Sequence, residues 1–242
     1  MIQAINLRKT FEDKKRGSII AVDDASFEVK PGEIFGLLGL NGAGKTTTLR
    51  LLAGILKPES GTALIDGIDV VKKPEAAKGR LGFMTGSTGL YGRLKAIEMI
   101  KYFGRLYGMP ELKITERTEA LMTMLGLTEY AEFKCDKLST GNKQKVSIAR
   151  TMIHDPQVII LDEPTAGLDV IASRALIEFI HSEKRRNKTI IFSTHVMHEA
   201  EKLCDRIGII HKGKIIGVGT PSDLNRNAGC ADLDDTFVKM VG

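Results

Sequence analysis

The sequence is poor in cysteine, and the few it has form no paired motif. Cys135, Cys204 and Cys230 lie far apart, and no C-x-x-C spacing occurs. An odd, scattered set is typical of reduced thiols in a cytosolic protein and not of a disulfide framework. The five histidines also lack the spacing of zinc ligands. We therefore expect three reduced thiols and no zinc site.

Long apolar runs are missing as well. No run approaches the ~18 residues that a membrane-spanning helix needs, and residues 1–8 show no basic-then-apolar signal pattern. The chain by itself is therefore expected to cross no membrane.

A dense basic block is the third absence. The net charge is only +5, from 35 basic and 30 acidic residues. The longest basic cluster, residues 184–186, follows a helical pattern and is read as a solvated helix end. A nucleic-acid partner is not expected, because its footprint would be a stronger basic stripe.

What is present reads as an ordinary globular chain of 242 residues, 43% hydrophobic and 27% charged. Alternation over residues 1–30 predicts antiparallel strands joined by a loop at 12–17. Continuous apolar runs at 34–38, 158–161 and 189–193 predict strands buried on both faces. Further expected elements are helices over 45–56, 170–186 and 196–204, a strand with a turn over 62–70, a hairpin over 206–219 and a short amphipathic helix over 233–240.

The middle of the chain has the apolar periodicity of helices instead of strands. Apolar residues recur at helical spacing over 94–107, 115–125 and 142–154, and Asp155-Pro156 stops the third helix. We expect residues 88–156 to form a helical subdomain inserted into an α/β core made of residues 1–87 and 157–242.

The strongest motif is the G-x-x-x-x-G-K-[ST] run from Gly39 to Thr46. Its glycines let backbone N–H groups turn toward phosphate oxygens, and the helix that follows points its positive end at the same anion. Lys45 supplies a positive charge to the β- and γ-phosphates, and the Thr46 hydroxyl can ligate Mg²⁺. A chance glycine-rich turn is the alternative, but a buried strand before it and a helix after it favour a phosphate site.

Two further motifs carry chemistry. The apolar strand at 158–161 ends in Asp162 and Glu163, which suit a metal ligand and a general base for an attacking water. Taken alone, an apolar strand that ends in such a pair is more often only a strand leading into a polar loop. The phosphate loop upstream favours the catalytic interpretation instead.

A third motif lies before the helix expected over 142–154, where Ser139 or Thr140 can act as a helix cap. The sharper alternative is a second anion-binding helix terminus made by Ser139 and the Gly141 backbone.

In this order the motifs resemble the nucleotide-binding domain of the ABC transporter superfamily, over nearly the whole chain. Residues 39–46 resemble Walker A, 138–142 the signature, 158–163 Walker B, 164–169 the D-loop and 193–195 the switch-histidine segment. The resemblance implies an α/β fold: a P-loop NTPase core with an N-terminal antiparallel β subdomain and an inserted α-helical subdomain.

The resemblance also implies site residues. Glu163, His195 and Lys45 would be catalytic, and Thr46 and Asp162 would bind Mg²⁺. His195 alone would be read as a strand-end histidine bonded to a neighbour. The expected ATP contacts are Phe11, which would stack on adenine, with Gly39, Asn41, Gly42, Ala43, Gly44, Lys45, Thr46, Thr47, Ser139, Gly141 and Asp169.

The implied partners are a second copy of the chain and a separate transmembrane permease. Two copies would pair head to tail, so that Ser139 and Gly141 act on ATP held by the other copy. The chain would then lie at the cytoplasmic face of the membrane. Residues 90–94 and 233–240 look like those of bacterial ABC-2-type exporters, and residues 84–91 resemble sodium-efflux ATPases of the Nat type.

The chain departs from the family pattern at two places. Thr140 and Asn142 replace Gly and Gln of the signature, which is expected to have a modest effect. Gly86 stands where the family carries the glutamine that reaches Mg²⁺ and the attacking water. Thr85, Ser87 or a water would have to substitute, so we expect ATP binding and dimerisation to survive while hydrolysis is in question.

Two other function classes remain open. A soluble ABC ATPase of translation or DNA repair usually needs two tandem domains or a long coiled coil, and neither fits this sequence. A regulatory nucleotide-binding module without hydrolysis is opposed by Glu163 and His195 and left open by Gly86.

Overall fold

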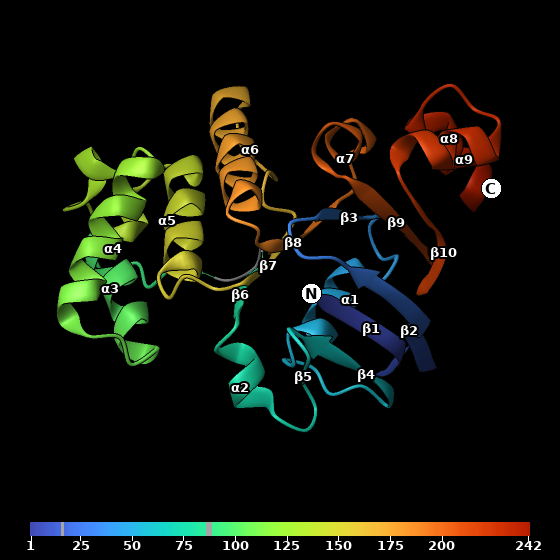
Figure 1. The fold of residues 1–242 in the computed structure, drawn as a ribbon, viewed down its shortest axis with the longest axis horizontal. Helices are drawn as coiled ribbons and strands as arrows, with labels where there is room; N and C mark the ends of the chain where they lie inside the picture. Colours follow the sequence, from blue (N-terminus) through green and yellow to red (C-terminus); the bar gives the residue numbers. More distant parts are fainter. Residues whose placement is uncertain (16, 86–88) are drawn as a thin grey trace.

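The structure, a computed structural model, describes residues 1–15, 17–85 and 89–242. A four-stranded sheet of order β2-β1-β4-β5 lies beside a six-stranded sheet of order β10-β9-β3-β8-β7-β6 (Figure 1). The first sheet is antiparallel, and Ile2 of β1 faces Val29 of β2. Its strands are β1 (Ile2–Asp13), β2 (Gly17–Val29), β4 (Ser60–Ile65) and β5 (Ile68–Asp69). The predicted N-terminal antiparallel strands are therefore confirmed.

The larger sheet holds the parallel strands that the apolar runs predicted. Its strands are β3 (Ile34–Leu38), β6 (Leu81–Thr85), β7 (Val158–Asp162), β8 (Thr189–Thr194), β9 (Arg206–His211) and β10 (Lys214–Gly219). Every residue of β3, β7 and β8 is buried. Alternate residues explain why: Ile34 and Leu38 enter the core that the helices share, whereas Phe35 and Leu37 enter the core beneath the antiparallel sheet.

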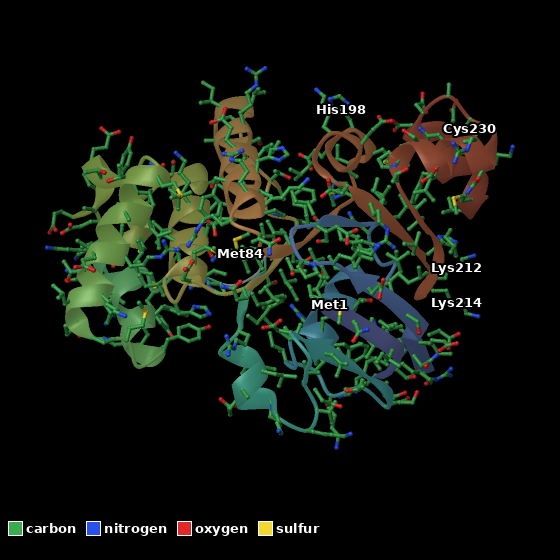
Figure 2. The ribbon with its side chains drawn as sticks, viewed as in Figure 1. Met1, Met84, His198, Lys212, Lys214 and Cys230 are labelled. Atoms are coloured by element: carbon green, nitrogen blue, oxygen red, sulfur yellow. The ribbon has the colours of Figure 1, made fainter. Side chains whose placement is uncertain are left out.

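The helices are α1 (Lys45–Leu52), α2 (Pro74–Lys78), α3 (Ala96–Leu106), α4 (Glu111–Met124), α5 (Thr140–Met152), α6 (Val170–Arg185), α7 (Met197–Leu203), α8 (Pro221–Ala228) and α9 (Leu233–Val241). Two 3₁₀ turns cover Thr128–Tyr130 and Cys135–Lys137. Helices α3, α4 and α5 pack together at one end of the molecule (Figure 1). Met84 of β6, labelled in Figure 2, lies in the core between this group and the sheet. Within the described ranges, no helix is both long enough and apolar enough to span a bilayer.

These elements confirm the predicted fold class, with three differences in detail. The helix expected over 45–56 ends at Leu52, because Gly54 takes the left-handed conformation that terminates helices (φ 64°). Helix α2 was not predicted, since its five residues carry little periodicity. Helix α8 was also missed, although its cap Thr220, Pro221 in the first turn and Gly229 after the end form a start-and-stop pattern. The predicted subdomain boundary between residues 87 and 88 lies outside the described residues.

Candidate functional site

Three loops leave the same edge of the large sheet. Parallel pairing sets Leu38 of β3 opposite Thr194 of β8, and Asp162 of β7 opposite Ser193 of β8. The carboxyl ends of parallel strands meet at one edge, where ligands of open α/β sheets bind. The phosphate loop, Glu163 and His195 therefore begin side by side, although they are far apart in the sequence.

The phosphate loop encloses a small pocket in front of helix α1. The pocket has a volume of about 170 Å³. Gly44 takes φ 110°, and a Cβ there would lie 2.4 Å from the carbonyl oxygen of Ala21, so this position requires glycine. The pocket is lined by Ala21, Leu40, Asn41, Gly42, Gly44, Lys45, Thr46, Thr47 and Glu163.

Two of the expected loop contacts hold the loop's shape instead of lining the pocket. The amide of Gly39 donates to the carbonyl of Thr194 at 3.4 Å, and the amide of Ala43 donates to Leu40 at 3.1 Å. Ala43 is buried in the core beneath the antiparallel sheet. Ala21 of β2 lines the pocket but was missed by the sequence analysis, because no local motif marks it.

Lys45 joins the loop to Glu163. Its side chain is 4% exposed, and the ammonium donates to the carbonyls of Gly39 at 2.8 Å and Leu40 at 3.2 Å and lies 3.2 Å from Glu163 Oε1. A compact ammonium has three donors, and Lys45, which lines the pocket, makes three such contacts. A phosphate group bound there would meet this charge directly.

Glu163 lies between Lys45 and His195. His195 Nδ1 lies 3.4 Å from the same Oε1 atom that Lys45 contacts. Glu163 adopts a left-handed backbone (φ 47°), a costly conformation for this residue type that turns the chain out of β7. Its amide donates to the hydroxyl of Ser193 at 3.0 Å. The carboxylate can therefore accept a proton from a water held between these groups.

Asp162 and Thr46 provide the oxygen donors that Mg²⁺ prefers. Asp162 is 4% exposed, and its Oδ1 accepts the Ser193 hydroxyl at 2.7 Å. Over the described part of the chain, no cluster of three or more His, Cys, Asp or Glu side chains could hold a metal. Mg²⁺ is commonly held by one or two protein oxygen ligands together with phosphate oxygens and water. The donor set fits the ion.

The signature residues lie elsewhere in the same copy. Ser139 caps α5 by accepting the Asn142 amide at 3.2 Å, so the cap interpretation is confirmed. A Cβ at Gly141 would lie 3.6 Å from the Cβ of Ala172, which places the signature against the start of α6. Asp169 caps α6 by accepting the Ala172 amide at 2.8 Å. The structure does not bring Ser139, Gly141 or Asp169 into the lining of the phosphate-loop pocket, as described above.

Phe11 lies on β1, paired with Ile19 of β2, and its ring is 40% exposed with the Lys9 ammonium 5.7 Å from its centroid. It does not belong to the lining of the described pocket. The departure at Gly86 lies outside the described residues, together with Ser87 and Thr88.

Comparisons with known proteins agree with this geometry. A family model described as "ABC transporter" matches residues 22–166. The chain belongs to the ABC transporter family. It is an ATP-binding subunit of an ABC transporter, an ATPase whose hydrolysis of ATP drives transport.

Among similar proteins, ABC transporter ATP-binding protein NatA of Bacillus subtilis (strain 168) is 44% identical over 100% of this chain and 98% of its own length. Nod factor export ATP-binding protein I of Cupriavidus metallidurans (strain CH34) is 38% identical over 95% of this chain and 75% of its own length. A solved ATP-binding subunit of an ABC transporter superposes with a TM-score of 0.89 at 30% identity, covering 99% of both chains. A dimeric bacterial ABC transporter cassette, MJ0796, superposes with a TM-score of 0.83 at 25% identity, covering 91% of this chain and 98% of its own.

Proposed function

We propose that this chain is the motor of an exporter, in which ATP closes a dimer of two copies and thereby moves a separate membrane subunit. The similarity to an ATP-binding protein named for Nod factor export supports the direction of transport. The chain would lie at the cytoplasmic face of the membrane, held there by the permease. We further propose that the transported ion is sodium, because residues 84–91 resemble those of Nat-type sodium-efflux ATPases. The permease, and not this chain, would select the ion.

The observation that carries this proposal is the sharing of one Glu163 oxygen by Lys45 and His195, at 3.2 and 3.4 Å. In the proposed mechanism Glu163 takes the proton of the attacking water. His195 contacts the γ-phosphate and orients Glu163, while Lys45 neutralises phosphate charge. Mg²⁺, held by Thr46 and Asp162, would neutralise the phosphate charge further.

The nucleotide would lie on the phosphate loop, from Gly39 through Asn41, Gly42, Ala43 and Gly44 to Thr47. Phe11 would stack on adenine. The other copy would add Ser139, Gly141 and Asp169, which do not line the phosphate-loop pocket within one copy. Val170 and Ile171 follow Asp169 directly and are 70% and 82% exposed. A second copy burying these side chains would explain an apolar pair at the surface. Residues 88–156 would form the helical subdomain that carries the signature.

Glu163→Gln in the full-length chain tests the proposal. The amide keeps the shape but cannot accept the proton, so ATP hydrolysis should fall by about 10²–10⁴-fold. Light scattering with saturating ATP and Mg²⁺ should detect a dimer that the nucleotide-free sample lacks. Glu201→Gln, an exposed change on α7, is the matched control and should hydrolyse at the native rate. A Glu163→Gln chain that stays monomeric, or hydrolyses at the native rate, refutes the proposed roles.

A further inference from the structure

Glu199, in the first turn of α7, holds a position between the two catalytic loops. Its Oε2 atom accepts the hydroxyl of Thr165 at 3.0 Å and the hydroxyl of Thr194 at 3.0 Å. Hydrogen bonds to a carboxylate are stronger than bonds between neutral groups. One oxygen atom therefore joins two segments that are distant in the sequence.

Each threonine is close to a residue of the proposed mechanism. Thr194 immediately precedes His195, and its hydroxyl also accepts the amide of Val196 at 3.0 Å. A hydroxyl has one proton and two lone pairs, so donating to Glu199 leaves it free to accept this amide. The backbone is thus held on both sides of His195.

The second threonine restrains the loop of Glu163. Thr165 is 9% exposed and lies inside a turn in which the amide of Ala166 donates to the carbonyl of Glu163 at 3.1 Å. A second contact comes from α5, where Gln144 Nε2 donates to the carbonyl of Pro164 at 2.7 Å. This loop is therefore anchored both to α7 and to the helix that carries the signature.

Such anchors are needed because the sheet does not extend this far. The register between β7 and β8 ends at Asp162 and Ser193. The left-handed backbone of Glu163 then turns the chain away from the strand. Beyond its contacts with Ser193, the hydrogen bonds between β7 and β8 no longer fix the position of the Glu163 side chain.

We propose that Glu199 is a positioning residue that keeps Glu163 and His195 in register, acting through Thr165 and Thr194. The proposal rests on the catalytic roles proposed above for Glu163 and His195. Glu199 does not act as an acid or base in it, since its function is only to accept two hydrogen bonds. A neutral acceptor of the same shape should serve nearly as well.

The test measures kcat and KM for Mg-ATP with the full-length chain carrying Glu199→Ala or Glu199→Gln. In Glu199→Ala, kcat should fall about 10- to 100-fold, because small displacements of catalytic groups cost rates of this order. KM should stay within about two-fold, because the phosphate loop is untouched. Glu199→Gln should keep most of the native kcat, since its amide oxygen accepts both hydroxyls. Glu201→Ala, exposed on the same helix, should behave as the native chain.

Two further variants keep the proposal testable if Glu199→Ala folds poorly. Thr165→Val and Thr194→Val remove one hydroxyl each and should lower kcat with little change in KM. Combining Thr165→Val with Glu199→Ala should cost no more than Glu199→Ala alone, because the Thr165 hydroxyl bonds to Glu199 and both changes break that same link. Fully additive losses, a native kcat in Glu199→Ala, or equal losses in Glu199→Gln and Glu199→Ala would overturn the proposal.

Failure of the underlying mechanism looks different. If Glu163→Gln hydrolyses ATP at the native rate, the catalytic role of Glu163 is wrong whatever Glu199 does. If Glu163→Gln is inactive while Glu199→Ala retains native kinetics, only the role of Glu199 is wrong.

Discussion

Acidification should destabilise this protein through His154, which joins α5 to β7. Its ring stacks on Tyr107 with the centroids 3.6 Å apart, and Nε2 lies 3.2 Å from the carbonyl oxygen of Leu81, placing the proton on Nε2. Nδ1 is buried without a hydrogen-bond partner among the described residues. Burial therefore lowers the pKa of His154 from 6.5 to about 4, and the Leu81 bond opposes this only in part. Protonation of Nδ1 would bury an unpaired donor and a charge.

The size of the effect follows from that shift. The unfolded chain takes up the proton at a higher pH than the folded chain, so stability is present above pH 6.5 and is lost as the pH falls toward about 4. One pKa unit corresponds to about 1.36 kcal/mol. Between about pH 7.5 and about pH 5, the folded protein should therefore lose at most about 2 kcal/mol of stability. The figure is an upper bound because the His154 ring is partly exposed, so solvent screens part of the charge. The pKa of Asp155 is raised by burial but lowered on balance by Lys188 and two arginines, so its contribution is lost only below 3.8.

Urea denaturation of the native chain and of His154→Phe at both pH values measures this contribution. Phenylalanine keeps the stack on Tyr107 and cannot titrate, so the native chain should lose more stability than the variant, by up to about 2 kcal/mol. The comparison uses the change with pH, which cancels any loss of stability common to both conditions. His198→Gln on α7, an exposed position labelled in Figure 2, should keep the native pH dependence. Equal losses in the native chain and His154→Phe would refute the reasoning.

Two further changes test the ion pairs and the phosphate loop. Lys188→Met should lower the free energy of unfolding by about 2 kcal/mol in urea titrations, because Lys188 is 1% exposed and its ammonium pairs with Asp155 and, at 3.2 Å, with the buried Glu183. Arg186 still contacts the Glu183 carboxylate at 3.0 Å in this variant, which keeps the loss from being larger. A loss below about 1 kcal/mol would contradict the pairing. Gly44→Ala should weaken ATP binding at least about 10-fold in calorimetry, since φ is 110° and the new Cβ would meet the Ala21 carbonyl. Gly67→Ala is the control: Gly67 also has a positive φ, but a Cβ there would meet no atom within 4 Å, so this variant should bind ATP as the native chain does. Native ATP affinity in Gly44→Ala as well as in Gly67→Ala would contradict the proposed geometry of the phosphate loop.

The sequence was sufficient where the physical cause is local. The phosphate loop from Gly39 to Thr46 is contiguous, so the spacing of its glycines and Lys45 in the sequence was enough to predict the loop. The alternation of β1 and β2 and the apolar runs of β3, β7 and β8 were read correctly, because burial on one or both faces leaves its period in the chain. Ser139 and Asp169 were identified as site candidates, and capping is also a local property of each.

Tertiary structure alone decided which of these segments meet. The order β3-β8-β7 inserts β8 between the phosphate loop and Glu163, and this brings His195 to the Glu163 carboxylate. No spacing in the sequence predicts that a carboxylate on α7 accepts hydroxyls from two loops. Nor does it predict that His154 is buried with a ring nitrogen that hydrogen-bonds to none of the described residues. Motifs are short-range, whereas hydrogen bonds, desolvation and pKa shifts depend on neighbours that only folding supplies. The sequence therefore determined the chemistry that this ATPase carries, and the fold determined how its parts are held together.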